Sequence, residues 1–332
     1  MTHVAVMGAG SWGTAFSLVL ADAGNEVHLW GRRAELCQQI TTRHENPDYL
    51  PGVVLPKSVG ASPEAAEALT GATVVVLAVP SQTLRANLER WTPLLAPGAV
   101  LLSLMKGVEL GTAKRMSEVI ADVTGAASDQ IGVVSGPNLA REIAERLPAA
   151  SVVACADEQV AERLQQLCHT ATFRPYTNTD VVGCELGGAT KNVIALAVGM
   201  ASGLGLGDNA TASVITRGLA ETARLAQAAG ADPMTMAGLA GLGDLVATCS
   251  SPLSRNRGFG EKLGSGMSVE QVVASTRQVA EGMKSAESLR ELAQRYAVDM
   301  PIVEHVTGVL RGDMTPAQML MSLISRAARP ER

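Results

Sequence analysis

Lys191 and Asn192 interrupt a stretch of small and apolar residues that has the pattern of a helix. Residues 185–199 are otherwise almost entirely glycine, alanine and aliphatic residues on every helical face. A lysine in such surroundings is partly desolvated, which suits its ammonium group to general acid/base catalysis. The alternative is an exposed lysine on an amphipathic helix, which would carry no chemistry.

A second polar cluster follows a glycine-rich apolar stretch. Residues 237–253 contain a single carboxylate, Asp244, and Ser254, Arg255 and Asn256 come directly after them. Serine, arginine and asparagine together make a clamp for a phosphate or a carboxylate, because their N–H and O–H donors can converge on anionic oxygens. The alternative is the capped start of a helix that carries surface arginines.

Three glycines at the start of the chain have the spacing GxGxxG. Gly8, Gly10 and Gly13 follow the apolar run 4–7 and precede the helix-like run 14–20. In this context the first glycine permits a tight turn, the second lets the backbone approach a pyrophosphate, and the third lets the helix pack on the strand. The amides of the first helical turn then face the phosphates. The motif therefore predicts a dinucleotide site.

Arg32 and Arg33 follow the second apolar run, residues 26–30. An NAD-specific site usually has an acidic residue near this point, which binds the ribose 2′-hydroxyl. A carboxylate would repel a 2′-phosphate, whereas arginines can bind one through charge-assisted hydrogen bonds. The alternative is a solvated arginine pair at the end of a strand. We expect NADP(H) to be the preferred cofactor, with NAD(H) also used.

Alternating strands and helices must position these residues. Apolar runs at 73–79, 99–104, 131–134 and 150–155 alternate with helical patterns, which is typical of parallel βαβ units. Ligands bind at the carboxyl ends of the strands in open α/β sheets, so the loops after the first three runs should line the site. We predict an α/β domain at residues 1–180, with a Rossmann-type, doubly wound and mostly parallel sheet.

The pattern changes after about residue 180, where strand-like runs give way to alanine- and leucine-rich helical segments. We predict an all-helical second domain at residues 181–332. No spacer rich in proline, glycine or serine separates the two parts, so one long helix is expected at the boundary. The helical patterns cover residues 181–200, 210–229, 269–273, 285–296, 302–310 and 316–326.

The composition is that of an ordinary globular protein. The 332 residues are 47% apolar and 18% charged, with a formal net charge of −5 and no long run of either sign. This balance argues against a nucleic-acid surface. The five cysteines are odd in number and lack CxxC spacing, which favours reduced thiols. No histidine stands at metal-ligand spacing, so we expect no metal.

The chain also lacks the pattern of a signal peptide before its first strand run. Its most apolar later stretch, residues 193–206, is too short and too rich in glycine to span a bilayer. We therefore expect a soluble, cytoplasmic protein whose partner is a small molecule.

Taken together, the motifs resemble those of the bacterial NAD(P)-dependent sn-glycerol-3-phosphate dehydrogenases. They follow the family's order over nearly the whole chain, and the combination is far more specific than any single motif. The chain departs from the pattern at Asn138, where the family more often has Ser or Thr, and residues 32 and 33 vary within the family. The matching segments are Gly8–Ala15, Lys106–Glu109, Ser135–Pro137, Gly187–Asn192, Thr216–Glu221, Gly238–Asp244, Ser254–Arg257 and Ala280–Gly282.

The resemblance implies that dihydroxyacetone phosphate and NAD(P)H are interconverted with sn-glycerol 3-phosphate and NAD(P)+. It implies that Lys191 is the general acid/base at the C2 oxygen, that Lys106 is a second ammonium near substrate and nicotinamide, and that Asp244 holds Lys191. It also implies a homodimer that supplies glycerol phosphate for phospholipid synthesis. The implied substrate contacts are Lys106, Gly136, Asn138, Lys191, Asn192, Asp244, Ser254, Arg255 and Asn256. The implied cofactor contacts are Gly8, Gly10, Ser11, Trp12, Gly13, Arg32, Arg33, Lys106, Ala140, Arg255, Val279 and Glu281.

Two other functions share this plan. A 3-hydroxyacid or 6-phosphogluconate-type dehydrogenase also combines a Rossmann domain with a helical one, but the cluster Ser254–Arg257 after Asp244 favours glycerol phosphate. A non-catalytic NADPH-sensing regulator would have no reason to keep Lys191, Asp244 and Arg255 together. An assay of NADPH oxidation by dihydroxyacetone phosphate, run beside assays with 6-phosphogluconate and hydroxyacid partners, distinguishes the three functions.

Overall fold

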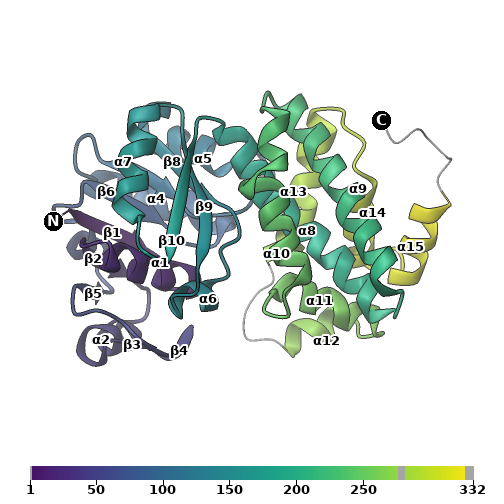
Figure 1. The fold of residues 1–332 in the computed structure, drawn as a ribbon, viewed down its shortest axis with the longest axis horizontal. Coiled ribbons are helices and arrows are strands. Elements are labelled where there is room, and N and C mark those ends of the chain that lie inside the picture. The colour runs from purple at the N-terminus through teal and green to yellow at the C-terminus, as the bar shows by residue number, and fades with distance from the viewer. Residues whose placement is uncertain (1, 276–280, 326–332) are drawn as a thin grey trace.

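The computed structural model describes residues 2–275 and 281–325. Figure 1 shows two parts side by side, and we call residues 2–178 the sheet half and the described residues from 181 onward the helical half. The described chain starts at the outer side of the sheet half and ends at the outer side of the helical half (Figure 1).

The sheet half is built on an eight-stranded sheet with the order β10-β9-β8-β7-β6-β1-β2-β5. All neighbouring strands are parallel except β8 and β9. The expected doubly wound, mostly parallel sheet is confirmed. Its central strands are continuous aliphatic runs because helices cover both faces. The strands are β1 (His3–Met7), β2 (Glu26–Trp30), β5 (Val59–Ser62), β6 (Val74–Leu77), β7 (Val100–Ser103), β8 (Ile131–Ser135), β9 (Ala149–Cys155) and β10 (Phe173–Asn178).

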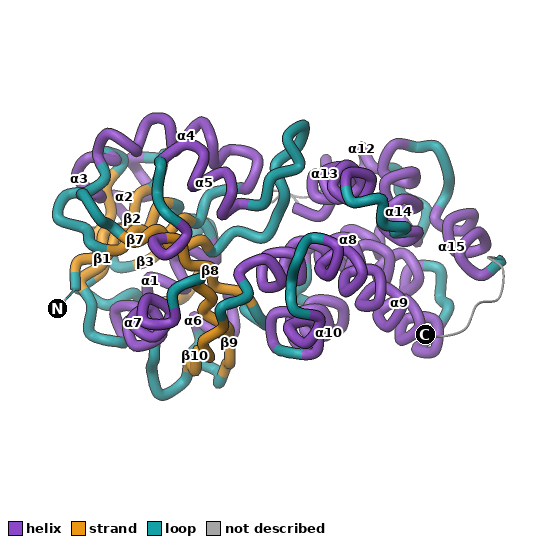
Figure 2. Tube along the Cα trace, turned by 90° about the horizontal axis from the view of Figure 1, so that it is seen from above, coloured by secondary structure: helices purple, strands orange, loops and turns teal. Residues whose placement is uncertain are grey.

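Helices lie on both faces of this sheet, as Figure 2 shows from above. One face is covered by α1 (Ser11–Asp22), α6 (Ala140–Ala144) and α7 (Glu158–Cys168). The other face is covered by α3 (Ala65–Leu69), α4 (Leu84–Trp91) and α5 (Met116–Thr124). A further helix, α2 (Ala34–Arg43), follows β2. The carboxyl ends of β1, β6, β7 and β8 therefore meet at one edge, where the glycine motif and the loop carrying Lys106 emerge.

Some elements of the sheet half were not predicted. β10 contains Pro175 and alternates buried and exposed residues, as an edge strand can, because its outer side pairs with no other strand. The hairpin of β3 (Glu45–Asn46) and β4 (Leu50–Val54) is short and mostly exposed. β9 was expected from its apolar run, but the sequence did not indicate that it runs antiparallel to β8.

The helical half is organised around α8 (Val181–Gly203), which is buried from Gly183 to Ala201. It is the only described helix long and apolar enough to cross a membrane, yet its surface is covered by protein, so it is the core helix of this half. The helices around it are α9 (Gly207–Ala228), α10 (Asp244–Ser250), α11 (Arg255–Gly264), α12 (Val269–Ala274), α13 (Glu281–Arg295), α14 (Pro301–Arg311) and α15 (Pro316–Ile324).

Close backbone approach joins α8 to α11. A Cβ on Gly199 would overlap the carbonyl oxygen of Arg257, and a Cβ on Gly260 would overlap that of Leu196. The small residues of the sequence pattern are therefore a packing requirement. The predicted helix at 316–326 is observed from Pro316 to Ile324, and its last predicted residue lies outside the described residues.

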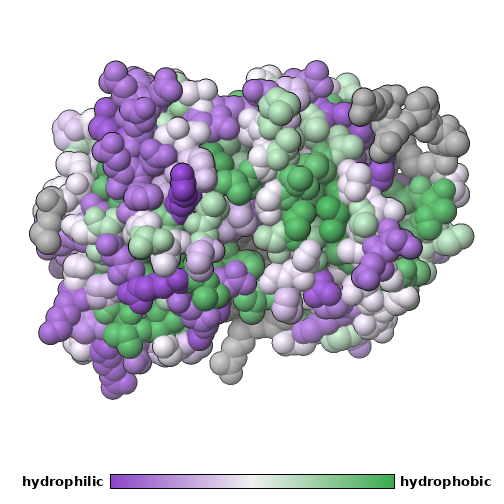
Figure 3. Space-filling model, in the orientation of Figure 1, coloured by the Kyte–Doolittle hydropathy of each residue, from purple (hydrophilic) through white to green (hydrophobic). Residues whose placement is uncertain are grey.

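The surface mixes polar and apolar residues, and Figure 3 shows one concentrated apolar area on the helical half. It lies where Figure 1 places α9 and α10. Leu242, just before α10, and Val246 within it are both exposed.

Candidate active site

The glycine motif forms a cradle at the N-terminus of α1. Gly8 has a φ of +141°, and a Cβ there would overlap the carbonyl oxygen of Ala78. A Cβ on Gly13 would overlap the carbonyl oxygen of Gly8, whereas Gly10 faces open space. The first-turn amides of α1 have no partner within the helix and are free for an anion. This geometry fits the pyrophosphate of a dinucleotide.

Ser11, Trp12 and Ala140 lie around this cradle. The Ser11 hydroxyl donates to the carbonyl oxygen of Tyr49 at 3.1 Å. Trp12 packs edge-on against Phe16, and its buried indole nitrogen has no hydrogen-bond partner. Ala140 begins α6 and packs against the same core as Trp12. An unpartnered buried donor beside the cradle is a feature that a bound ligand can satisfy.

The two arginines after β2 have different surroundings. Arg33 forms an ion pair with Asp48 at 2.6 Å, which raises the pKa of its guanidinium, and it lies 5.8 Å from the ring centre of Tyr49. Arg32 has no ion pair with any residue that the structure describes. The two arginines look equivalent in the sequence, where no pattern marks Asp48 or Tyr49 as a partner of Arg33.

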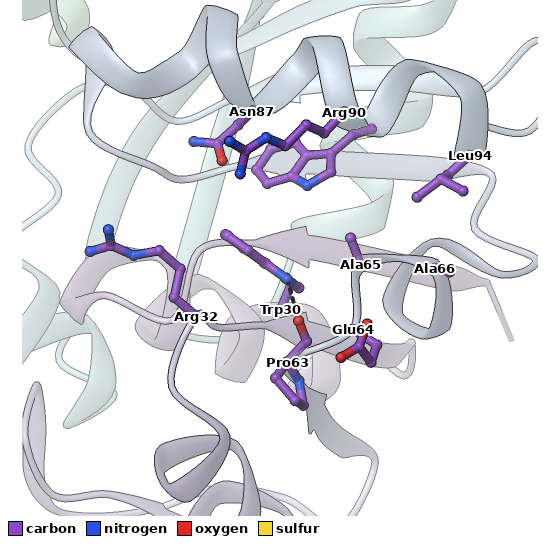
Figure 4. Close-up of a pocket in the computed structure, with 10 residues that line it drawn as sticks. Trp30, Arg32, Pro63, Glu64, Ala65, Ala66, Asn87, Arg90 and Leu94 are labelled. Atoms are coloured by element: carbon purple, nitrogen blue, oxygen red, sulfur yellow. Dashed lines mark hydrogen bonds between the residues drawn. The ribbon is translucent and has the colours of Figure 1, made fainter.

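Arg32 instead borders a pocket of about 360 Å³ between the end of β2 and α4. Figure 4 shows the Arg32 side chain extending from the end of β2 on the side of the pocket where Asn87 lies, and the guanidinium of Arg90 lies beside Asn87. The buried rings of Trp30 and Trp91 meet edge to face beneath them, 4.9 Å between centres. Arg90 also has no ion pair within the described chain. Two guanidinium groups without an ion pair in the described chain thus border one pocket, at the edge of the sheet where the glycine motif emerges.

Two lysines and one carboxylate meet between the halves. Asp244, which begins α10 and is only 1% exposed, accepts a hydrogen bond from Lys191 at one oxygen and from Lys106 at the other, the latter at 2.5 Å. Lys191 also donates to the Thr248 hydroxyl at 2.9 Å, and Lys106 donates to the carbonyl oxygen of Gly136 at 2.9 Å. The predicted grouping of these residues is thus present in the structure.

Burial lowers the pKa of Lys106 to about 8, even though Asp244 opposes the shift. Lys191 contributes in the same direction as burial, because a like charge disfavours a second ammonium. Two ammonium groups on one carboxylate leave a net positive charge when both are protonated. Such a site attracts an anionic substrate without a positive protein surface, in a chain with a net charge of −5.

Small residues let these side chains converge. A Cβ on Gly187 would overlap the carbonyl oxygen of Ala240, just before α10. A Cβ on Gly188 would come within 3.0 Å of the Ser135 hydroxyl and 3.3 Å of the Lys106 side chain. The glycines before Lys191 therefore keep room for α10 on one side and for Lys106 on another. Thr248 was missed, although it lies one helical turn after Asp244, where i,i+4 spacing could have indicated it.

The Ser254–Arg257 cluster forms the start of α11, close to the lysines. Ser254 caps the helix by accepting from the Arg257 amide at 3.3 Å. The Asn256 amide group donates to Asn192 at 2.9 Å and accepts from Gly282 at 3.0 Å. Both interpretations made from the sequence are compatible here, because a capped helix start also presents free amides to an anion.

Asn192 connects this helix start to the lysines. Its amide nitrogen donates to the carbonyl oxygen of Lys106 at 3.4 Å, while its oxygen accepts from Asn256. Arg255, the first residue of α11, has an exposed side chain. The Ser254 and Asn256 side chains thus bond to other groups within the protein. The first amides of α11 have no partner within the helix and can donate to an anion at this end.

Gly136 and Asn138, two more of the predicted residues, lie in or beside this region. Gly136 has a φ of +130° and supplies the carbonyl that accepts from Lys106. Asn138 donates to the Ser151 hydroxyl at 3.1 Å, and its own buried carbonyl oxygen has no partner. Val279 lies outside the described residues, and Glu281 begins α13 without a described side chain.

Comparison with known proteins gives consistent matches along the chain. The family model of the NAD-dependent glycerol-3-phosphate dehydrogenase N-terminus matches residues 3–161, and that of the C-terminus matches residues 180–321. A glycerol-3-phosphate dehydrogenase [NAD(P)+] of Streptomyces griseus is 66% identical, with 100% of both chains covered. One from Thermobifida fusca is 63% identical, over 100% of this chain and 99% of the other.

The structural comparison agrees with the sequence matches. The crystal structure of glycerol-3-phosphate dehydrogenase from Coxiella burnetii has a TM-score of 0.94 and 37% identity, covering 98% of this chain and 99% of that one. The likeness therefore extends over both halves and the region between them.

Proposed function

Because the chain belongs to the NAD-dependent glycerol-3-phosphate dehydrogenase family, we propose that Lys191 gives and takes the proton in its reaction. The protein is an NAD(P)-dependent oxidoreductase that interconverts dihydroxyacetone phosphate and sn-glycerol 3-phosphate. The observation that supports the role of Lys191 is that its ammonium group and that of Lys106 both donate to the buried carboxylate of Asp244. Lys106 comes from the sheet half and Lys191 from the helical half, so the two donors meet where the halves adjoin.

The nicotinamide cofactor, when bound, supplies the hydride that reaches C2 of the ketone. The protein must then provide a proton at the C2 oxygen and stabilise the charge that develops there. Asp244 and Thr248 orient the Lys191 ammonium, which donates that proton. Lys106 adds a second positive charge at a buried position, where charge stabilisation is stronger than in water.

The substrate phosphate binds at the start of α11 in this proposal. The free helix amides and the Arg255 guanidinium hold the phosphate oxygens, while Ser254 and Asn256 keep the helix end in place. Asn192 links this end to Lys106. Gly136 and Asn138 border the same region from the sheet half.

The central test is the variant Lys191→Met. Turnover should fall by ~10²-fold or more, which is the scale of lost general acid/base catalysis, while binding of NADPH stays nearly unchanged. Lys57→Met, at an exposed lysine before β5, is the matched control and should keep full turnover. Near-normal turnover of Lys191→Met would overturn the assignment.

A panel of substrates tests the reaction itself. Dihydroxyacetone phosphate should oxidise NADPH, while 6-phosphogluconate and 3-hydroxyacids should give no comparable turnover with the oxidised cofactor. Activity with a hydroxyacid alone would support the rival dehydrogenase class. No turnover with any substrate, together with tight NADPH binding, would support the regulator.

We further propose that NADP(H) is preferred over NAD(H). Arg32 and Arg90 border the same pocket, and neither has an ion pair within the described residues. Both guanidinium groups can therefore donate hydrogen bonds to a 2′-phosphate. NADH lacks that phosphate and remains usable through the glycine cradle. The kcat/KM for NADPH should exceed that for NADH, and equal values for the two cofactors would overturn the preference.

The family resemblance also supports a cytoplasmic homodimer that supplies glycerol phosphate for phospholipid synthesis. We propose that residues 1–180 form its dinucleotide domain and residues 181–332 its substrate domain. Light scattering should give about twice the chain mass of 34.4 kDa, and a single species at the monomer mass would contradict the dimer. Cells without the protein should regain phospholipid synthesis when glycerol 3-phosphate is supplied.

A further inference from the structure

A buried carboxylate that the proposed chemistry does not use connects the two halves. Glu185, in α8, has a side chain only 3% exposed and accepts from the Arg115 guanidinium at 2.6 Å. It also accepts from the Ser117 amide at 2.7 Å and from the Ser117 hydroxyl at 2.5 Å. Burial raises the pKa of Glu185, and the two partners oppose that shift. These donors come from the start of α5, in the sheet half.

Arg115 closes the loop that carries Lys106. Its backbone pairs with Val108 in an isolated antiparallel bridge, and Val108 is fully buried two residues after Lys106. The loop also meets α13, where the exposed Gly111 amide donates to Glu291. Gln82 and Arg85 also hold this loop from within the sheet half, through Val108 and Glu109. From the helical half, Asn192 bonds to the backbone of Lys106 and Glu291 to the exposed tip, whereas Glu185 bonds to the buried end of the loop.

These contacts complete a ring through the active site. Glu185 holds Arg115, Arg115 pairs with Val108, and Lys106 then reaches Asp244. Lys191 returns to the same carboxylate from α8, less than two helical turns after Glu185. One helix therefore carries both a catalytic lysine and the anchor of the loop that carries the other.

We propose that Glu185 and Arg115 are positioning residues that set the place of Lys106 relative to Lys191. The proposal rests on the catalytic roles of the two lysines given above. The proposal gives neither positioning residue a contact with substrate or cofactor, because the buried Glu185 carboxylate bonds to Arg115 and Ser117. Glu185 and Arg115 would affect the rate because the two ammonium groups can share Asp244 only when the two halves keep one relative position. A displacement of about 1 Å at a reacting group can lower the rate by ~10²-fold.

The main experiment compares Glu185→Gln with Glu221→Gln. Glu221 is a matched control, because it is also a buried carboxylate that accepts from the first amides of a helix, here Ile302 of α14, but it lies outside the ring. Glu185→Gln should lower kcat by ~10-fold or more, with the KM for dihydroxyacetone phosphate and the Kd of NADPH within about 2-fold of the parent. Glu221→Gln should leave kcat unchanged.

A purely structural role for Glu185 predicts a different pattern. Loss of folded protein would lower the measured activity in proportion to the folded fraction, and it would leave kcat per folded molecule unchanged. Circular dichroism and active-site titration of NADPH binding measure that fraction. A kcat per folded molecule within about 2-fold of the parent value in Glu185→Gln would overturn the proposal.

Milder variants keep the test decisive if Glu185→Gln does not fold. Ser117→Ala removes one donor and Arg115→Lys keeps the charge while losing the fork, so each should lower kcat by less than Glu185→Gln. Combining Ser117→Ala with Arg115→Lys should cost less than the product of the two losses, because both act through one carboxylate. A kcat equal to that of the parent in both folded single variants would refute the positioning role of Glu185 and Arg115. Lys191→Met separates the two ideas: if it keeps turnover, the catalytic assignment itself has failed, whatever Glu185 does.

Discussion

At the scale of single residues, neighbours in the sequence have separate roles. Arg32 and Arg33 formed one anion-binding pair in the sequence analysis, yet Arg33 already has Asp48 as a partner at 2.6 Å. Arg32 faces the pocket that Arg90 also borders. A new anion would compete with Asp48 at Arg33 but would meet no such competition at Arg32. Discrimination between the cofactors should therefore depend mainly on Arg32.

Single alanine variants test this difference. Arg32→Ala should lower kcat/KM for NADPH by ~10- to 100-fold, since one charge-assisted hydrogen bond contributes about 1.5–3 kcal/mol, and exposure places the effect toward the lower end. It should change kcat/KM for NADH little. Arg33→Ala is the internal comparison, with a smaller loss for NADPH. Equal losses in the two variants, or a larger one in Arg33→Ala, would contradict the assignment.

At the scale of elements, the start of α11 has a structural role, and the binding role proposed for it uses the same helix end. Ser254 caps the helix and Asn256 joins it to α8 and α13. The capped end keeps its remaining amides directed outward, next to Arg255. The sequence alone left two interpretations of this cluster. The structure shows the capped helix start, and the anion clamp stays a prediction that this geometry allows.

Arg255→Lys tests the binding role of this helix end. It keeps the positive charge but loses the planar fork, so the KM for dihydroxyacetone phosphate should rise by ~10-fold while kcat changes little. Unphosphorylated dihydroxyacetone should be affected much less. Arg257→Lys is the control, because Arg257 is bound to Glu261 on the same helix. An unchanged KM in Arg255→Lys would place the phosphate elsewhere.

Elements with a strong local pattern could be predicted from the sequence, and those defined by distant contacts could not. β6 and most of β7 are aliphatic runs, and α8 has a small-residue pattern over most of its length. β10 contains Pro175 and depends on pairing with β9, so no local signal marks it as a strand. The orientation of β9 follows from the sheet, and its own residues do not specify it.

The candidate site divides in the same way. Lys191 and Asp244 were recognisable because each departs from its apolar surroundings, whereas Lys106 was indicated by the family resemblance. No local pattern indicates that they meet, because the contact joins a loop of the sheet half to two helices of the other half; only the resemblance implied that Asp244 holds Lys191. The partner of Arg33 comes from the short hairpin that the sequence did not indicate. Local chemistry was thus predictable, while the pairing of side chains needed the three-dimensional fold.

At the scale of the whole molecule, α8 determines how the halves are placed. It starts directly after β10, contacts the sheet through β8 and β9, and then becomes the core of the helical half. Two buried carboxylates, Glu185 and Glu221, lie on α8 and on its neighbour α9. Glu185 has an arginine partner, whereas Glu221 is bound by backbone amides of α14. Their contributions to stability should therefore depend on pH in different ways.

Glu221 should make the protein less stable at alkaline pH. Burial raises its pKa to about 7, and the bond from Ile302 opposes the shift only partly. The folded state then holds the carboxyl proton of Glu221 more tightly than the unfolded state, in which a glutamate has an ordinary pKa of about 4.3. The stability that the protonated group contributes is fully present below about pH 4 and is lost as the pH rises through about 7.

Glu221→Gln should remove that loss, because an uncharged amide can still accept from the Ile302 amide without an ionised group in the core. Relative to the parent, the free energy of unfolding of the variant should be higher at pH 8 than at pH 5, by up to about 3 kcal/mol. Urea denaturation at the two pH values measures the difference. Glu304→Gln, at an exposed carboxylate on the same helix α14, should show no such gain between pH 5 and pH 8. The same stability difference at both pH values in Glu221→Gln would mean that Glu221 is already ionised at pH 5 in the folded protein, with its charge held by the start of α14.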